Sequence, residues 1–405
     1  YLPRDHRILE AWLTTRIAKL EQSSDLVLAP VIQEFQKVIE DDPAIYMLFH
    51  QMFEQVPTKP PYNKDPTGKP QVRNYKVMLG LFNMIIADAP HYENNDLVGF
   101  PINAILDWPM GTPAGLSAFI TPKINLQFTK MFEVWSAYLV SPESRKVLTT
   151  APNGWFGPAA SKAMPNFAAT YVCEPNAPYH GFKSWDDFFT REFRLKVRPV
   201  IDPDNNDVVN NACESTIYRI TPGAQLRDCF WLKGEPYSLL DMLNHDRLTS
   251  QFEGGTVYQA FLGATDYHRW HSPVNGKIVK TVPCPGTYYA ESPAMGFNNP
   301  DGPDPAAPNL SQAFITSLAA RALIFIEADN PKIGLMCFVA VGMAEVSTCQ
   351  ITVSDGATVK KGDQLGMFHF GGSTHCLLFR KETKLNFQYK VRDKVELNKI
   401  IATVI

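Results

Sequence analysis

The chain has 405 residues, of which 45% are hydrophobic, 20% charged and 12% aromatic, and its formal net charge is -3. This length exceeds what one hydrophobic core usually fills, which indicates two domains or one domain with a large extension. The composition excludes a disordered or fibrous protein, and the mixed charges, which form no basic stretch, exclude nucleic acid as a partner.

Residues up to about 160 carry apolar side chains three and four positions apart, which is the spacing of amphipathic helices. The pattern is clearest from Leu9 to Leu20 and from Met78 to Ile85. Two proline-rich segments, Val56 to Pro70 and Phe100 to Pro113, predict surface loops between the helices. We therefore expect a helical N-terminal domain over residues 1–180.

The pattern changes after Tyr179. A short helix is expected at Trp185–Phe189, because Ser184 is a suitable N-cap and acidic residues follow in the first turn. From Pro199 onward, short β-rich runs alternate with turn signals, which predicts a mainly β domain over residues 181–405. The fold class is therefore α+β.

Two later segments refine this domain. The apolar run from Ile333 to Ala344 is shorter than the roughly 20 residues that a membrane-spanning helix needs, and it predicts a buried strand. The stretch from Ile351 to Phe370 predicts two short strands joined through Asp-Gly and Lys-Gly-Asp turns, which resembles half of a lipoyl-like barrel sandwich. No segment predicts integral membrane association.

The cellular location follows from cysteine usage and from the start of the chain. The seven cysteines are scattered without a Cys-x-x-Cys pair, which favours reduced thiols. The first residues, beginning at Tyr1, have the character of neither a signal peptide nor a transit peptide. We expect a cytoplasmic protein.

The segment from Phe368 to His375 contains the most reactive arrangement in the chain, Gly372-Ser373. A turn or bulge is the ordinary interpretation of such a segment. Alternatively, the Ser373 hydroxyl can attack the Gly372 carbonyl and move the acyl group from nitrogen to oxygen, because Gly372 has no side chain to obstruct it. Elimination from that ester leaves dehydroalanine, and hydrolysis then leaves a pyruvoyl group at a new N-terminus.

Such an attack needs a base with an orienting partner, and His268 and His271 are the candidates. Three positions apart, they would face opposite sides of a regular strand, but a bend before Pro273 could aim both inward. Ordinary histidines with satisfied hydrogen bonds remain the alternative. A metal site is not favoured, since no third ligand cluster is evident.

Taken together, these segments resemble the phosphatidylserine decarboxylase family, whose precursors cut themselves at a Gly-Ser bond near the C-terminus. The resemblance covers about half the chain, and its motifs are ordered and spaced as in the family. These motifs are Phe182–Arg191, Arg198-Pro199, Tyr267–Gly276, Lys361–Gly366 and Phe370–Thr374.

The resemblance implies roles for five residues. Cleavage would follow Gly372, and Ser373 would become the pyruvoyl cofactor. His271 would be the base of the self-cleavage triad, with Glu214 at the position where the family carries Asp. His268 would serve decarboxylation, protonating the carbon from which carbon dioxide leaves.

A closer resemblance is to the fungal branch of this family that decarboxylates aromatic amino acids. It rests on the helical extension, on Ala212–Ser215 and on Gly366–Ser373. It implies a small-molecule amino acid substrate, tryptophan first, with tryptamine as product, without pyridoxal phosphate and without metal. The partner chain would be the protein's own fragment, residues 373–405.

Three other functions stay open. A phosphatidylserine decarboxylase that makes phosphatidylethanolamine would share the fold and the cofactor. A Ser-His-Glu hydrolase is less consistent with the sequence, because no Gly-x-Ser-x-Gly elbow is present. A non-catalytic, lipoyl-like binding protein would keep Ser373 within one chain, so the intact mass separates it from a self-cleaving enzyme.

Overall fold

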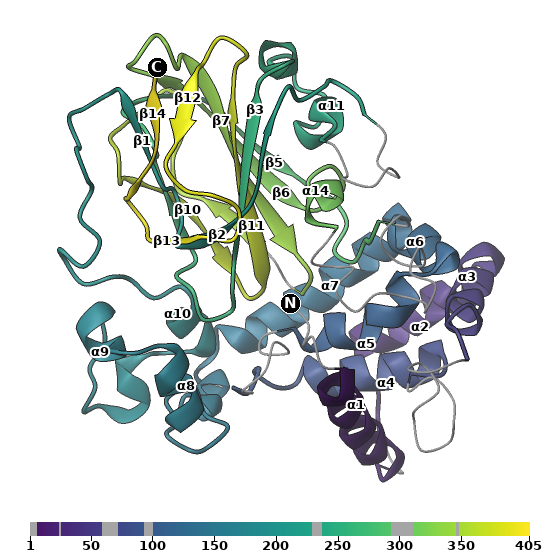
Figure 1. The fold of residues 1–405 in the computed structure, drawn as a ribbon. Coiled ribbons are helices and arrows are strands. Elements are labelled where there is room, and N and C mark those ends of the chain that lie inside the picture. Colours follow the sequence, from purple (N-terminus) through teal and green to yellow (C-terminus); the bar gives the residue numbers. More distant parts are fainter. Residues whose placement is uncertain are drawn as a thin grey trace.

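The computed structural model of the protein describes residues 6–23, 26–58, 72–92, 100–228, 237–292, 311–345 and 348–405. Helices from the first half of the chain gather beside a β-rich body built from the second half (Figure 1). This arrangement confirms the predicted α+β class. The expected domain boundary at residue 180 stays a prediction.

The N-terminal helices pack around one core of aromatic and aliphatic side chains. They are α1 (His6–Glu21), α2 (Pro30–Asp41), α3 (Pro43–Glu54), α4 (Tyr75–Ile85), α5 (Pro101–Met110), α6 (Pro113–Phe119) and α7 (Pro122–Leu139). The two helix-period segments, Leu9 to Leu20 and Met78 to Ile85, lie in α1 and α4, as predicted.

The prediction of a loop from Phe100 to Pro113 is wrong, because α5 fills most of that segment and α6 begins at its end. Proline stands in the first turn of α2, α3, α5, α6 and α7. In the first turn of a helix the backbone N–H has no acceptor within the helix, so the missing N–H of proline costs no hydrogen bond. These prolines therefore begin helices and do not form the connections between them. Most of the other predicted loop, residues 59–70, lies outside the described residues.

Short helices connect the two halves and accompany the strands. They are η1 (Pro142–Val147), α8 (Pro158–Ala163), α9 (Phe167–Thr170), η2 (Pro178–Gly181), α10 (Trp185–Phe189), α11 (Leu239–Met242), η3 (Thr249–Phe252) and α14 (Gln312–Ile315). Helix α10 is the predicted one, and the Ser184 Oγ accepts a hydrogen bond from the Asp187 backbone N–H at 3.0 Å. Its N-cap is thereby confirmed.

Among the described residues, the strands form three sheets. The largest has the order β13-β2-β3-β11-β7-β6-β5-β9, with antiparallel neighbours throughout. Its strands are β2 (Ser215–Pro222), β3 (Thr256–Leu262), β5 (Gly276–Cys284), β6 (Arg321–Ala328), β7 (Leu335–Met343), β9 (Thr358–Val359), β11 (Gly372–Phe379) and β13 (Lys394–Val395). Strand β7 is the predicted buried strand.

The two smaller sheets have the orders β4-β10-β8 and β1-β14-β12. Their strands are β1 (Val208–Asn210), β4 (Arg269–His271), β8 (Thr348–Ile351), β10 (Gln364–His369), β12 (Leu385–Phe387) and β14 (Ile400–Val404). Trp270 of β4 lies 5.5 Å from Phe338 of β7 between ring centroids, so one small sheet packs on a face of the large sheet. The stretch predicted to be lipoyl-like forms the short strands β9 and β10, of which β9 belongs to the large sheet and β10 to a small one.

The end of the β-rich body is embedded in the helical core. Tyr289, Ala344 and Phe370, which lie in connections between strands, belong to the same hydrophobic cluster as α2 to α7. The segments that lead into β11 and out of β7 are therefore held by the N-terminal helices. None of the helices in the described part of the chain has both the length and the apolar character needed to cross a membrane.

Candidate active site

Ser373 lies near the start of β11, in the middle of the large sheet. It is directly opposite Leu262 of β3 and Gly342 of β7, and it is fully buried. Its Oγ forms no hydrogen bond with any described residue. A buried hydroxyl without a partner is costly in an ordinary core, which makes Ser373 a functional candidate.

Backbone strain gathers around the Gly372-Ser373 bond. Phe370, just before Gly371 and Gly372, has a φ of 66°, in the left-handed region that bulky residues avoid. Across the sheet, Ala344 and Glu345 follow β7 with φ values of 56° and 41°. Such conformations persist only where packing enforces them, and they cluster at functional sites.

His268 lies beside this strained turn. Its backbone carbonyl accepts a hydrogen bond from Phe368 N–H at 2.9 Å, and its buried ring stacks on Phe189 at 3.9 Å between centroids. Burial, and secondly the Arg191 charge, hold the pKa of His268 well below its ordinary value, and neither ring nitrogen has a hydrogen-bond partner among the described residues. The ring is therefore neutral near pH 7 and can accept a proton.

A short turn, in which the Asp266 backbone N–H donates to Gly263 O at 3.0 Å, connects the His268 segment to the strand beside the reacting one. Gly263 follows Leu262, which is the residue directly opposite Ser373 on β3. His268 thus lies five residues beyond Gly263, just after the turn that follows the strand partner of Ser373. The structure places these two predicted site residues in one neighbourhood.

His271 is placed differently. Its Nδ1 lies 2.7 Å from the carbonyl oxygen of Gly362 and its Nε2 lies 3.0 Å from the Tyr267 hydroxyl. Trp270 points into the core between the sheets, whereas His271 packs against Tyr267 on the opposite side of β4, at an irregularity in the pairing with β10. The expected bend that would aim both histidines inward is not formed. Along the strand, His271 lies roughly 10 Å from His268.

Glu214, the predicted acid, is engaged by other groups. One carboxylate oxygen lies 2.7 Å from the Arg198 guanidinium, and the other accepts a hydrogen bond from the Leu397 backbone N–H at 2.8 Å. The His271 backbone N–H donates to Ala212 O at 2.9 Å, so the segment carrying Glu214 runs beside β4. The carboxylate nevertheless orients Arg198 rather than the His271 ring.

Sequence reasoning missed Glu345, which is fully buried next to the cleavage segment. Its Oε1 accepts hydrogen bonds from the backbone N–H groups of Ile102 and Asn103, each at 3.0 Å, at the start of α5. The Tyr289 hydroxyl donates to its Oε2 at 3.4 Å. A lone acidic residue after an apolar strand gives no signal of these contacts, which depend on how the helices dock.

We expect Glu345 to make the stability of the chain depend on pH. Burial raises its pKa to about 8 from an ordinary 4.5, despite the two backbone N–H donors. The folded chain therefore binds this proton more tightly than the unfolded chain, so stability falls as pH rises from about 4.5 to about 8. Glu345→Gln, whose amide oxygen can accept the same bonds, should remove a loss on the order of 1 to 4 kcal/mol.

Urea unfolding of the Ser373→Ala chain, with and without Glu345→Gln, measures this effect without interference from cleavage. Comparing pH 5.5 with pH 8, the free energy of unfolding should fall less in the Gln variant. Equal pH profiles for the two proteins would show that Glu345 is ionised throughout the folded state.

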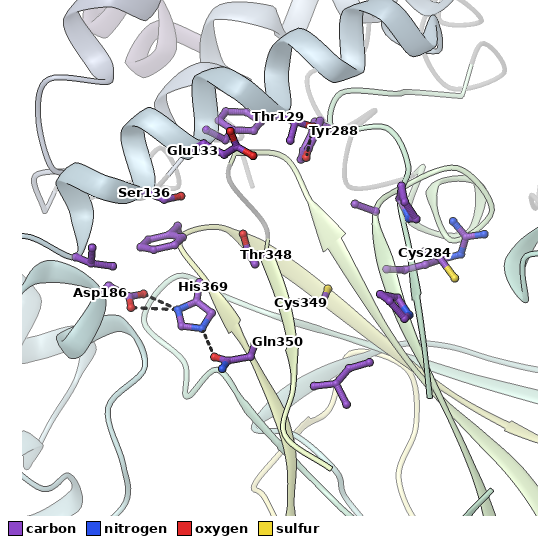
Figure 2. A pocket seen from close by; sticks show the side chains of 18 of the residues that line it. Thr129, Glu133, Ser136, Asp186, Cys284, Tyr288, Thr348, Cys349, Gln350 and His369 are labelled. Atoms are coloured by element: carbon purple, nitrogen blue, oxygen red, sulfur yellow. Dashed lines mark hydrogen bonds and ion pairs between the residues drawn. The ribbon is translucent and has the colours of Figure 1, made fainter. Parts of the chain in front are cut away.

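A large cavity of about 1030 Å³ lies between α7 and the ends of β5, β8 and β10. Figure 2 shows His369 in its wall, two residues after Met367 and four before Ser373, with its ring between Asp186 and Gln350. The His369 Nδ1 lies 2.9 Å from Asp186 Oδ1, and its Nε2 lies 2.8 Å from Gln350 Oε1. This pair of contacts fastens the end of β10, just before the strained turn, to α10.

The site holds no arrangement typical of a resident metal. Within the described ranges, no group of three or more His, Cys, Asp or Glu side chains is placed to bind an ion. The cysteines of those ranges are all free thiols, and Cys229 lies outside them.

Comparison with known proteins identifies relatives of this chain. Two phosphatidylserine decarboxylase family profiles match residues 29–164 and 185–403. An L-tryptophan decarboxylase of Psilocybe cubensis is 40% identical over 97% of this chain and 90% of its own length. The decarboxylase iboD of Amanita muscaria is 46% identical over 76% of this chain and 91% of its own length. The phosphatidylserine decarboxylase proenzyme 3 of Schizosaccharomyces pombe is 31% identical over 51% of this chain and 20% of its own length.

Proposed function

The chain belongs to the phosphatidylserine decarboxylase family, and from that premise we propose that it is a pyruvoyl-dependent decarboxylase of free aromatic L-amino acids, with tryptophan as the first substrate. The observation that carries the proposal is the 40% identity to an L-tryptophan decarboxylase over 97% of the chain, which includes the N-terminal helices. The matches to phosphatidylserine decarboxylase proenzymes span from 51% to 69% of the chain.

The residues around Ser373 fit the formation of a pyruvoyl group there. The Ser373 Oγ would bond to the Gly372 carbonyl carbon while the Gly372–Ser373 C–N bond breaks and the nitrogen takes up a proton. A base then removes the Ser373 Cα proton while the Gly372 carboxylate leaves with Oγ, which gives dehydroalanine. Addition of water to its imine form releases ammonia and leaves the keto group. The unpartnered Oγ and the strained turn at Phe370 support this sequence of events, because neither has a role in an ordinary core.

A pyruvoyl group supplies a carbonyl that holds the substrate amine and accepts the electrons released with carbon dioxide. The side chains of the protein do the rest. His268, neutral and buried beside the turn, can take the hydroxyl proton of Ser373 and later deliver a proton to the product carbon. Phe189, stacked on its ring, fixes the orientation of the imidazole and excludes water.

The C-terminal fragment would stay bound after cleavage. Strand β11 forms hydrogen bonds with β3 on one side and β7 on the other. Farther on, β13 pairs with β2 and β14 pairs with β1. These contacts hold the 33 residues 373–405 in the sheet without a peptide bond, so the matured enzyme is a complex of two fragments.

The substrate prediction is tested with matured protein and a panel of candidates. We expect carbon dioxide and the corresponding amine from L-tryptophan, weaker turnover of L-phenylalanine and L-tyrosine, and none of phosphatidylserine vesicles. Addition of pyridoxal phosphate should change no rate, and carbonyl reagents such as hydroxylamine should inhibit. Turnover of the vesicles alone would overturn the aromatic assignment and promote the lipid enzyme, which is the second candidate because of the shared family.

A further inference from the structure

The cavity between the helical region and the sheets is built mainly from one face of α7. The lining residues of α7 recur three and four positions apart, the spacing of a single helix face. They are Thr129, Phe132, Glu133, Ser136 and Ala137, and Val140, just after the end of the helix, continues the same face. The opposite wall comes from β8 and from the end of β10 (Figure 2). The cavity has a volume of about 1030 Å³, at the upper end of the range for small-molecule sites.

This cavity leads toward the reacting strand. Ala320 lines it and accepts a hydrogen bond from the Gly342 N–H at 2.9 Å, and Gly342 is directly opposite Ser373. Ala320 is thus two strand spacings, roughly 10 Å, from Ser373. Tyr288 also lines a second cavity of about 20 Å³ that reaches Gly342. The large cavity and the reacting strand are therefore neighbours, with Tyr288 between them.

The wall nearest Tyr288 combines aromatic rings with a pair of hydroxyls. The Phe132 and Tyr288 rings are in edge contact, with centroids 4.8 Å apart. The Tyr288 hydroxyl lies 3.0 Å from the Thr129 Oγ1, and the two point at each other in Figure 2. Because the Thr129 Oγ1 also donates to the Asn125 carbonyl oxygen at 3.0 Å, the Tyr288 hydroxyl donates to Thr129. Both hydroxyl hydrogens are thus used, and lone pairs of the two oxygens remain to accept another hydrogen bond.

We infer, resting on the function proposed above, that this cavity receives the side chain of the amino acid substrate and that the Tyr288–Thr129 hydroxyl pair selects aromatic rings carrying a hydrogen-bond donor. An indole N–H or a phenol O–H can donate to the pair, whereas a phenyl ring leaves it unpaired. The ring itself packs against Phe132. Tyr288 is thereby a specificity-determining residue for tryptophan and tyrosine over phenylalanine.

The first test removes the hydroxyl and keeps the ring. Tyr288→Phe should mature normally, because its hydroxyl touches only Thr129 on the cavity wall. For L-tryptophan, kcat/KM per matured chain should fall roughly 3- to 10-fold, the value of one hydrogen bond, and the value for L-phenylalanine should stay within about twofold. An equal fall for both substrates would overturn the selectivity assigned to the hydroxyl pair.

The second test measures whether the substrate occupies the cavity, independently of the rate at which it is decarboxylated. Ala137→Cys places a thiol on the exposed cavity face of α7, and Val134→Cys places one at an exposed position of α7 that does not line the cavity. In matured protein, L-tryptophan at several times its KM should slow alkylation of Cys at position 137 at least about threefold. Alkylation at position 134 should not change, with the labelled sites read from peptide masses.

The outcomes separate this inference from the function on which it rests. If matured wild-type protein decarboxylates tryptophan but alkylation at position 137 is indifferent to it, the side chain binds elsewhere and the inference fails alone. If no aromatic amino acid is turned over and none protects position 137, both fail. Protection together with a Tyr288→Phe effect confined to tryptophan supports both.

Discussion

Replacement of Ser373 by Ala is expected to leave the protein as one intact chain of 405 residues without decarboxylase activity. The wild-type protein should instead yield residues 1–372 and a fragment of 33 residues that begins with a pyruvoyl group. The physical reason is that the Ser373 Oγ is both the attacking atom and the atom that leaves with the Gly372 carboxylate, and without that loss no dehydroalanine, and hence no keto group, can form. Alanine fits the strand but has neither function.

Thr374→Val is the matched control for this prediction. Thr374 is equally buried, but it points to the other face of β11, where its hydroxyl donates to Ala260 O at 3.0 Å and contacts Gln259. Losing that hydroxyl costs about 1 kcal/mol of stability without removing the nucleophile, so the variant should still cleave. Intact mass and N-terminal chemistry measure both proteins. An active wild-type enzyme that remains a single chain would contradict the proposed origin of the cofactor.

Local signals explain which parts of this fold the sequence predicts. The N-cap at Ser184 and the apolar run of β7 depend on residues adjacent in the chain, and both were correct. The loop prediction for the segment from Phe100 to Pro113 was wrong, because proline is compatible both with loops and with the first turn of a helix. Only the packing of α5 in the helical core separates the two.

The site shows the same division between local and long-range information. The Gly372-Ser373 bond and the Tyr267–His271 segment are short motifs, so the sequence alone indicates them. The direction in which His271 points depends on the pairing of β4 with β10, in which it is opposite Gln364. The Arg198 partner of Glu214 and the α5 partners of Glu345 likewise come from folding. Such contacts leave no periodic pattern.

The second large effect concerns the two histidines, for which resemblance and geometry lead to different expectations. The family resemblance assigns His271 to self-cleavage and His268 to turnover. In the intact chain, however, His268 is buried just after the short turn that follows Leu262, the strand partner of Ser373, while His271 points to the other face of its sheet. Geometry therefore favours His268 as the base for cleavage.

On this geometry, His268→Gln should slow self-cleavage by roughly 10²- to 10⁴-fold, the usual contribution of a positioned base. His271→Gln should slow it less than about tenfold, through loss of the contacts with Gly362 and Tyr267. Time courses of the freshly purified precursors, followed by gel and mass, give both rates. Turnover is then measured per matured chain, so that a cleavage defect is not mistaken for a decarboxylation defect.

The pH dependence of cleavage adds a readout that a merely structural histidine would not give. Burial and the Arg191 charge lower the pKa of His268, so its ring stays neutral, and able to accept a proton, below the ordinary histidine value of about 6.5. The wild-type cleavage rate should therefore remain level from pH 8 down through pH 6 and decline only at lower pH. If His271→Gln stays uncut while His268→Gln matures at the normal rate, the roles implied by the resemblance hold. The cleaving conformation must then turn the His271 ring across its sheet toward Ser373.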